Sequence, residues 1–449
     1  METVVPFRAW RYAAAAGEPA QLVAPPYDVI GPDLQSRLYA RSVHNVVRVD
    51  LGMTTPSDND CDNQYTRAAA QLSQWKESGI LVRDPQPSIT FVEESFTGPD
   101  GRSRLRHGFL AAIRLHDFDD GVVFPHEHTL SGPKEDRYRL MTATAMSLSP
   151  VFLLYDLPGD DITAALEADL GAQAPAVTVA AEEGTVTKLR PTSDPALLRA
   201  VGQYLAATHF VIADGHHRYE TALRYRKHRH ADIASVGEPV VDDRQARRPA
   251  YDYIMAYFSN MADPGLAVYG THRLVAGLDP ETVAALPRSL ADTFAVERLT
   301  DAGTAQAAIA AYLDAHPRGA FGLWGPGLDA AYGLQLADPA AARTAAPYHS
   351  AAYQQLDVAI LQTLVLEKAL GITPGDMAAE THVTFFKDPK DAFARLEAGE
   401  FQAGFFMNPT GIDQIRQVAL GGERMPQKTT FFYPKLPTGL VFYDLSGML

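Results

Sequence analysis

The chain contains 449 residues, of which 46% are hydrophobic and 21% charged, and its formal net charge is −15. These fractions are typical of a globular protein, and the lack of a long apolar run excludes a membrane-spanning one. The acidic balance argues against sequence-independent binding to nucleic acid, which needs a basic surface. We therefore expect two or three packed lobes, with neither nucleic acid nor a membrane as partner. The sequence does not predict an oligomeric state.

The N-terminal segment and the cysteine content indicate the cellular compartment. Residues 1–20 contain no basic stretch leading into an apolar core, which a secretory signal would have. Cys61 is the only cysteine, so no disulfide can form within the chain. Both features favour a cytoplasmic protein. Because Cys61 lies in a polar stretch, we interpret it as a solvent-exposed residue and not as a nucleophile.

Residues 1–160 are expected to form a first α/β lobe. Runs of β-branched and aromatic residues between glycine, proline or aspartate predict strands at 43–51, 88–96, 106–115 and 151–157. The turn residues between the second and third of these runs predict a hairpin. Apolar residues at helical spacing predict helices at 63–79 and 132–150.

Residues 161–275 are expected to form a central lobe. Its clearest feature is an apolar strand that ends at Asp214, followed by a glycine and then by a helix with apolar periodicity. A helix at 193–208 with Ser193 as its N-cap precedes this strand. Strands are predicted at 250–260 and 266–275, and the basic, polar stretch 227–250 predicts a mobile loop.

Residues 276–449 are expected to form a C-terminal α/β lobe. The pattern predicts a helix at 354–371 and strands at 381–386 and 401–409. The whole chain is therefore predicted to adopt an α/β fold with mixed α+β sheets.

The strongest candidate for a functional site is the stretch Asp214-Gly215-His216-His217-Arg218. A glycine at the end of a strand permits a tight turn, and the first N–H groups of the following helix then point beyond the strand end. The helix dipole favours an anion there, and imidazole and guanidinium groups would add hydrogen bonds or a proton donor. The alternative is that Asp214 caps the helix and the histidines pack in the interior.

A second candidate is the segment FPHEHTLSGPKEDR, which contains two histidines close to acidic and basic residues. In an extended backbone His126 and His128 face the same side and could bind a metal ion together with a carboxylate. Contact with a substrate or a phosphate, or a purely structural role, remain alternatives. The acidic and basic residues that could join the two histidines in such a site are Glu127, Lys134, Asp136 and Arg137.

Two proline-containing segments complete the set of candidates. The stretch GERMPQKTTFFYPKLPTGL predicts a rigid polar loop carrying Lys428, Thr429 and Lys435, with an ordinary surface loop as the alternative. In VAPPYDVI the consecutive prolines restrict the backbone and so position Tyr27 and Asp28, either for chemistry or for a turn. Glycine patterns of the Walker A, serine hydrolase and dinucleotide-binding types are absent.

The segments APPYDVI, HEHTLSGPKEDR, FVIADGHHRYETAL, FFMNPT and GERMPQKTTFFYPKLPTGL, together with an Asn-Met-x-Asp-Pro-Gly-Leu stretch and THRLV, resemble the family called domain of unknown function 1015. This resemblance covers nearly the whole chain. The five residues from Asp214 to Arg218 are in addition similar to the phosphate-binding turn of the ParB/sulfiredoxin superfamily, which includes the free-serine kinases. That resemblance implies a nucleotide or phosphate at the helix N-terminus, usually with Mg²⁺. The flanking regions depart from that superfamily, which leaves the substrate and the base open.

The leading hypothesis is a nucleotide- or phosphate-dependent enzyme. It would transfer a phosphoryl group to a small metabolite such as serine, or hydrolyse a phosphate ester. His216 or His217 would act as acid, base or phosphate ligand. Arg218 and Lys428 would stabilise charge, and Asp28, Glu127 or Asp136 would serve as base or Mg²⁺ ligand, with Glu94 less favoured. A nucleotide sensor without catalysis and a metal-dependent hydrolase built on His126 and His128 are the alternatives.

Overall fold

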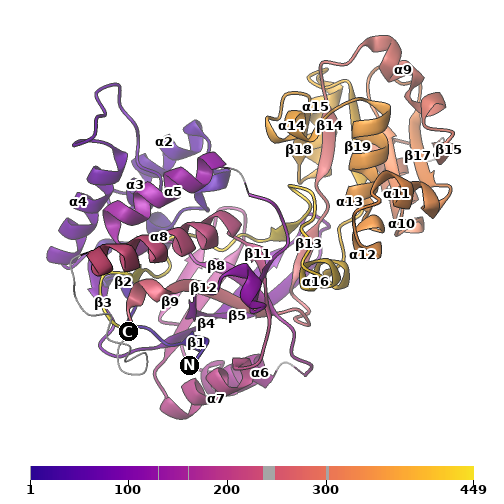
Figure 1. The fold of residues 1–449 in the computed structure, drawn as a ribbon. Coiled ribbons are helices and arrows are strands. Elements are labelled where there is room, and N and C mark those ends of the chain that lie inside the picture. Colours follow the sequence, from indigo (N-terminus) through magenta and orange to yellow (C-terminus); the bar gives the residue numbers. More distant parts are fainter. Residues whose placement is uncertain (1, 130, 160, 236–247, 300–302) are drawn as a thin grey trace. The chain divides into compact units, whose positions relative to one another are not determined.

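The computed structural model describes residues 2–129, 131–159, 161–235, 248–299 and 303–449. The chain divides into two compact units (Figure 1). Unit 1 comprises residues 1–124, 130–266 and 434–449, and unit 2 comprises residues 125–129 and 267–433. Each unit contains both helices and strands, so the predicted α/β class is confirmed.

Unit 1 is built around a nine-stranded mixed sheet with the order β6-β11-β8-β12-β5-β4-β10-β9, to which β1 adds beside β5. The pair β12 and β8 is parallel, whereas β11 and β8 run antiparallel. The predicted hairpin at 88–115 is confirmed as β4 and β5. The strands are β1 (Val4–Val5), β4 (Ile89–Thr97), β5 (Ser103–Arg114), β6 (Val123–Pro125), β8 (Val151–Tyr155), β9 (Val177–Ala180), β10 (Val186–Thr192), β11 (Phe210–Asp214) and β12 (Tyr253–Asn260). Short pairs join β2 (Trp10–Tyr12) to β3 (Leu81–Arg83) and β7 (Met146–Ser147) to β21 (Tyr443–Asp444).

Helices pack on this sheet and on one another, and α5 and α8 lie side by side (Figure 1). The helix predicted at 193–208 is present, but its N-cap is Asp194 and not Ser193, because the Asp194 carboxylate accepts from two N–H groups of the first turn. Helix α8 continues to Ser235, so residues 227–235 are helical and not part of a loop; residues 236–247 of the predicted loop lie outside the described residues. The main helices are α1 (Pro19–Leu22), α2 (Pro32–Arg41), α3 (Val47–Asp50), α4 (Gln64–Glu77), α5 (Ser131–Thr144), α6 (Asp161–Leu170), α7 (Pro195–Leu205) and α8 (His216–Ser235).

The prediction of a strand at 43–51 is wrong, because this segment forms the short helix α3. The side chain of Asn45 accepts from the backbone N–H of Val47 and donates to the carbonyls of Gln21 and Val23. The buried valines that follow belong to a cluster that also contains Trp75. A run of β-branched residues therefore became helical through local capping and tertiary packing, which override intrinsic propensity.

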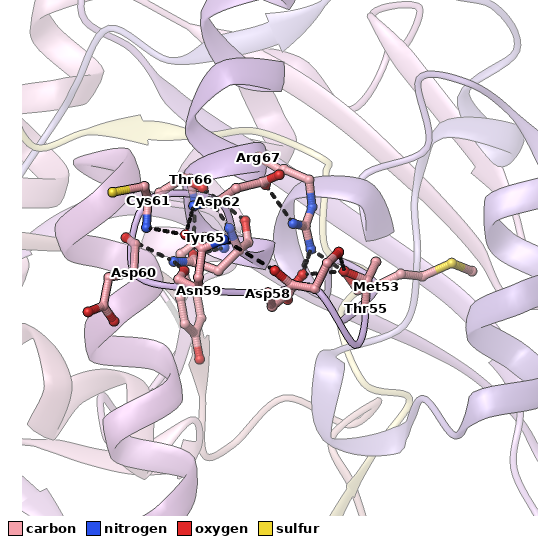
Figure 2. A network of polar contacts seen from close by, with 12 residues as sticks. Met53, Thr55, Asp58, Asn59, Asp60, Cys61, Asp62, Tyr65, Thr66 and Arg67 are labelled. Carbon is pink, nitrogen blue, oxygen red and sulfur yellow. Dashed lines mark hydrogen bonds and ion pairs between the residues drawn. The ribbon is translucent and has the colours of Figure 1, made fainter.

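The loop that leads into α4 is held by polar contacts of its own (Figure 2). The Asn59 side chain accepts from the N–H groups of Cys61 and Asp62, while Arg67 forms ion pairs with Asp58 and Asp62. Cys61 is exposed, as predicted. The acidic side chains of this loop thus position the start of α4.

Unit 2 contains a six-stranded sheet with the order β15-β17-β16-β19-β14-β18. The strands predicted at 381–386 and 401–409 are confirmed as β18 and β19, whereas the segment 266–275 divides into two strands, β13 and β14. The strands are β13 (Ala267–Tyr269), which pairs with β20 (Phe431–Tyr433), β14 (His272–Val275), β15 (Phe294–Leu299), β16 (Ala320–Trp324), β17 (Ala331–Leu336), β18 (Val383–Phe386) and β19 (Ala403–Met407).

Eight α-helices and one π-helix belong to the described part of unit 2. The helix predicted at 354–371 appears as α13 followed by a π-helix at Leu361–Ala369. The eight α-helices are α9 (Pro280–Ser289), α10 (Ala305–Ala315), α11 (Pro339–Ala345), α12 (Ala351–Gln354), α13 (Asp357–Ile360), α14 (Pro374–Ala378), α15 (Pro389–Glu397) and α16 (Ile412–Leu420). None of the helices in the described part of the chain combines the length and apolarity needed to cross a membrane.

Close packing in the unit 1 sheet predicts that Gly108→Ala is destabilising. An added Cβ would lie 2.4 Å from the carbonyl oxygen of Phe258 and 2.4 Å from the Tyr257 ring. We expect a loss of about 2 kcal/mol or more in urea unfolding, since overpacking in a tight interior costs roughly 1–3 kcal/mol. The control is Gly202→Ala in α7, where a Cβ meets nothing within 4 Å. This change should stabilise by about 0.5–1 kcal/mol, and equal effects of the two variants would contradict the packing argument.

Candidate functional site: an anion site at the start of helix α8

The predicted strand-turn-helix is present in unit 1. Strand β11 ends at Asp214, Gly215 has a φ of +89°, and α8 begins at His216. The positive φ favours glycine here, and a Cβ added to Gly215 would lie 2.9 Å from the Arg218 guanidinium, so that a larger residue would also displace this side chain. The helical ladder starts with the bond from the Tyr219 N–H to the Gly215 carbonyl. The first N–H groups of α8 therefore point toward the end of β11.

The Asp214 carboxylate is held between two cations. One oxygen accepts from Arg218 Nη2 at 2.6 Å, and the other forms an ion pair with Lys435 Nζ. Lys435 also lies 3.2 Å from Asp28 Oδ2, and Arg218 donates to the carbonyl of Pro150. Residues that are far apart in the sequence therefore meet at the start of α8. The sequence proposed Asp28, Asp214, Arg218 and Lys435 one by one, and the structure brings all four together.

The charges of this group support one another. Burial alone would raise the pKa of Asp214, but Lys435 and Arg218 outweigh it and hold the pKa below its usual range. Burial would likewise lower the pKa of Lys435, but Asp214 and Asp28 raise it above its ordinary value. Both groups are therefore ionised at neutral pH. His216 is buried beside Asp214, while His217 is partly exposed.

A second ionic group surrounds Arg137, which is buried on α5. Its guanidinium contacts Asp50 at 3.0 Å and Asp136 at 2.6 Å, and it lies 4.0 Å from the centre of the Tyr27 ring. Burial raises the pKa of Tyr27 to about 12, against the opposing effect of Arg137. The predicted residues Tyr27 and Arg137 therefore do meet. Lys134, also predicted, instead pairs with Glu220 of α8 at 2.9 Å.

Asp50 is the member of this group that the sequence analysis missed. Burial raises its pKa despite Arg137, and its Oδ2 is buried without a hydrogen-bond partner in the described part of the chain. The sequence feature that could have indicated it is an acidic residue near the end of the apolar run 43–51, which the strand prediction did not use.

Asp50, Arg137 and Arg218 line one cavity of about 30 Å³. That volume holds about one or two water molecules, so a larger ligand would have to bind at the more exposed side, near Asp28.

The HEH segment belongs to unit 2, where it holds the C-terminal loop. Glu127 Oε1 accepts from the N–H groups of Thr429 and Thr430 and from the Thr430 hydroxyl, each at 3.1 Å. His126 is fully buried and lies 2.8 Å from the same hydroxyl. Through these hydrogen bonds Glu127 and His126 hold the loop that contains Thr429 and Thr430. Lys428 has a φ of +56° and is exposed, as is His128.

The described residues contain no group of three or more His, Cys, Asp or Glu side chains that could hold a metal ion. Glu94, the less favoured base, is fully buried and pairs with Arg106 at 2.6 Å. Among the described residues, the alternative of a metal-dependent hydrolase built on His126 and His128 therefore has no supporting ligand cluster.

The Asp214 ion pairs predict a pH-dependent stability difference between the wild type and Asp214→Asn. At pH 7 the variant should lose about 2–4 kcal/mol, somewhat less than a fully buried pair because the Asp214 side chain is 24% exposed. Folding lowers the pKa of Asp214. The difference in unfolding free energy between wild type and variant is therefore fully present above the unfolded-state pKa of about 4, and it decreases as the pH falls toward the folded-state pKa. Urea unfolding from pH 7 to pH 3 measures it. A difference that is absent at pH 7, or that grows as the pH falls, would contradict the ion-pair account.

Comparison with known proteins supplies a family and distant structural neighbours. A conserved hypothetical protein from Pyrococcus furiosus is 16% identical, with 73% of this chain and 93% of that chain covered and a TM-score of 0.35. A free serine kinase variant in complex with AMP is 15% identical, with coverages of 75% and 92% and a TM-score of 0.37. SbnI from Staphylococcus aureus with a C-terminal truncation is 9% identical, with coverages of 76% and 87% and a TM-score of 0.34.

No curated protein matches the chain. The family model described as "Protein of unknown function (DUF1015)" matches residues 4–359. This match spans well over half of the chain and agrees with the resemblance seen in the sequence motifs. The chain therefore belongs to the DUF1015 family of proteins.

Proposed function

We propose that unit 1 binds the phosphate groups of a nucleotide or phosphorylated metabolite at the start of α8 and catalyses phosphoryl transfer on a small metabolite. The observation that carries this proposal is the meeting of Arg218 and Lys435 at the Asp214 carboxylate, directly beside a helix N-terminus. Both cations are ionised and are held in place before any ligand arrives. Such preorganised charge is the main contribution that a protein makes to phosphoryl transfer.

The helix terminus and the two cations favour the same ligand chemistry. The N-terminal end of α8 carries the positive end of the helix dipole, and its first N–H groups are suited to phosphate oxygens. The planar guanidinium of Arg218 can donate two parallel hydrogen bonds to a phosphate, and Lys435 adds a compact positive charge. Phosphate oxygens would compete with Asp214 and Asp28 for these donors. The carboxylates thus keep the cations charged and positioned until the ligand replaces part of their contacts.

Asp28 is our candidate for the general base. Its side chain is 43% exposed, and one oxygen lies 3.2 Å from Lys435. In the proposed step an acceptor oxygen attacks the transferred phosphorus, and its proton passes to the Asp28 carboxylate. The bond from phosphorus to the leaving oxygen breaks, and the leaving group retains the electron pair. The acceptor is the hydroxyl of a metabolite in a kinase reaction and water in a hydrolase reaction.

The histidines of the turn take supporting roles in this proposal. His217 is partly exposed at the first turn of α8 and would donate to a phosphate oxygen or to the leaving group. His216 is buried beside Asp214 and would position the turn. Mg²⁺ commonly binds to one or two carboxylates together with substrate phosphates. Asp28 is the exposed carboxylate at this site that fits such an ion, which would neutralise phosphate charge.

Replacement of Arg218 by alanine tests phosphate binding. We expect wild-type protein to bind AMP, ADP or ATP in calorimetry, and Arg218→Ala to bind about tenfold to hundredfold more weakly, because a charge-assisted hydrogen bond contributes roughly 1.5–3 kcal/mol. Arg224→Ala is the matched control, since Arg224 lies on the same helix but is half exposed and pairs with Glu135. If no nucleotide or phosphorylated metabolite binds, or if both variants bind like wild type, the phosphate site is refuted.

Replacement of Asp28 by asparagine separates catalysis from binding. Asparagine cannot accept the proton, so we expect the rate of phosphoryl transfer to fall by about 10²–10⁴-fold, while nucleotide affinity measured without Mg²⁺ changes little. Turnover is measured as formation of ADP and of phosphorylated product with a panel of hydroxyl-bearing metabolites, serine included, and as phosphate release in water. Tight binding by wild type without any turnover would instead identify a nucleotide sensor.

A further inference from the structure

Unit 2 contains a second cavity, which has no part in the function proposed for unit 1. Its volume is about 500 Å³, within the range of roughly 300–1,000 Å³ that small-molecule sites occupy. It lies between the ends of β16 and β17 and the helices α11, α12 and α13. Its polar lining residues are Arg318, Gln335, Arg343, Gln354, Gln355 and Asp357.

Asp357 provides a carboxylate with one oxygen engaged by the protein. Its Oδ1 accepts from the Gly319 N–H at 2.7 Å, whereas no hydrogen bond to its Oδ2 is found in the described part of the chain. Burial raises the pKa of Asp357 to about 6, with the Gly319 N–H and Arg318 acting in the opposite direction. The carboxylate is therefore mostly ionised at pH 7, although burial limits its hydration. A desolvated carboxylate of this kind gains most from a cationic hydrogen-bond donor.

Two guanidinium groups accompany this carboxylate in the cavity lining. Arg318 and Arg343 are both exposed, and neither side chain forms a hydrogen bond or ion pair with a described residue. Arg318 is close enough to Asp357 to influence its pKa. The cavity thus offers an anionic group together with two guanidinium groups that pair with no other side chain among the described residues.

The remaining walls suit the body of a small organic ligand. Leu336, Ala342 and Ile360 supply apolar surface, and glutamine side chains line other parts of the cavity. The wall formed by α13 continues directly into the π-helix at Leu361–Ala369. π-Helical turns are rare and are frequent at functional sites.

We propose that this cavity binds a zwitterion of the amino-acid class, namely an amino acid or a short peptide. The ligand ammonium would donate to Asp357, its carboxylate would accept from Arg318 or Arg343, and its side chain would lie on the apolar wall. A simple anion would leave the Asp357 carboxylate without a counter-charge. A bound metal ion lacks support, since the described residues form no cluster of three His, Cys, Asp or Glu side chains that could hold one.

The test is a binding screen of the full chain without nucleotide, so that its outcome does not depend on the site at α8. Thermal shift followed by calorimetry is carried out with each of the twenty L-amino acids and with a set of dipeptides. We expect at least one to bind, because a ligand of the folded state raises its apparent stability. N-acetylation or C-terminal amidation of that ligand should weaken binding about tenfold or more, since each removes one charged partner. Affinity should also fall as the pH drops below about 6.

Variants assign the binding to the cavity. Asp357→Asn keeps an oxygen for the Gly319 N–H but removes the charge, and it should weaken binding about tenfold or more. Arg318→Ala alters an exposed side chain and provides the same test should Asp357→Asn fold poorly. Arg298→Ala is the control, because Arg298 is an exposed arginine of unit 2 that pairs with Asp329 and does not line the cavity. The proposal is overturned if no amino acid or dipeptide binds, if acetylated and free ligands bind equally, or if both cavity variants bind like wild type.

Discussion

The pairing of the Asp214 carboxylate with Arg218 and Lys435 is the interaction on which the candidate site in unit 1 depends. A carboxylate removed from water costs several kcal/mol unless cations and hydrogen bonds compensate it. Arg218 comes from α8 and Lys435 from the C-terminal segment, and Lys435 also contacts Asp28 near the N-terminus. Compensation of this one buried carboxylate thus holds three distant parts of the chain together and places two cationic side chains beside a helix N-terminus. The phosphate ligand that we propose is inferred from that arrangement.

The local geometry of this site could be predicted from the sequence because its causes are local. An apolar strand, a glycine and a helical periodicity follow one another within a few residues, and each has its own pattern. Gly215 does adopt a positive φ, and the space above it is filled by Arg218. The hairpin formed by β4 and β5 and the strands β18 and β19 were predictable for the same reason. Capping and turn residues act on backbone only a few positions away, so their effect can be recognised in a single sequence.

The parts that failed depend on contacts between distant residues. The valines near Val47 have a pattern that suits a strand, and only the capping by Asn45 and packing on Trp75 make the segment helical. Asp28 and Lys435 are in contact although they lie near opposite ends of the sequence, and no periodic pattern indicates such a pairing. For Glu127 the sequence left a chemical and a structural role open, and the structure shows its Oε1 accepting from the backbone N–H groups of Thr429 and Thr430, a contact that no local pattern displays.

Hydrogen–deuterium exchange with and without ADP tests the central claim most directly, because it shows which amides a nucleotide protects. The account predicts slower exchange in the first turn of α8, around His216 to Tyr219, and in the segments that carry Asp28 and Lys435. Exchange elsewhere in unit 1 should change little. Protection confined to other segments, with the start of α8 unaffected at saturating ADP, would contradict a phosphate site built on Asp214, Arg218 and Lys435.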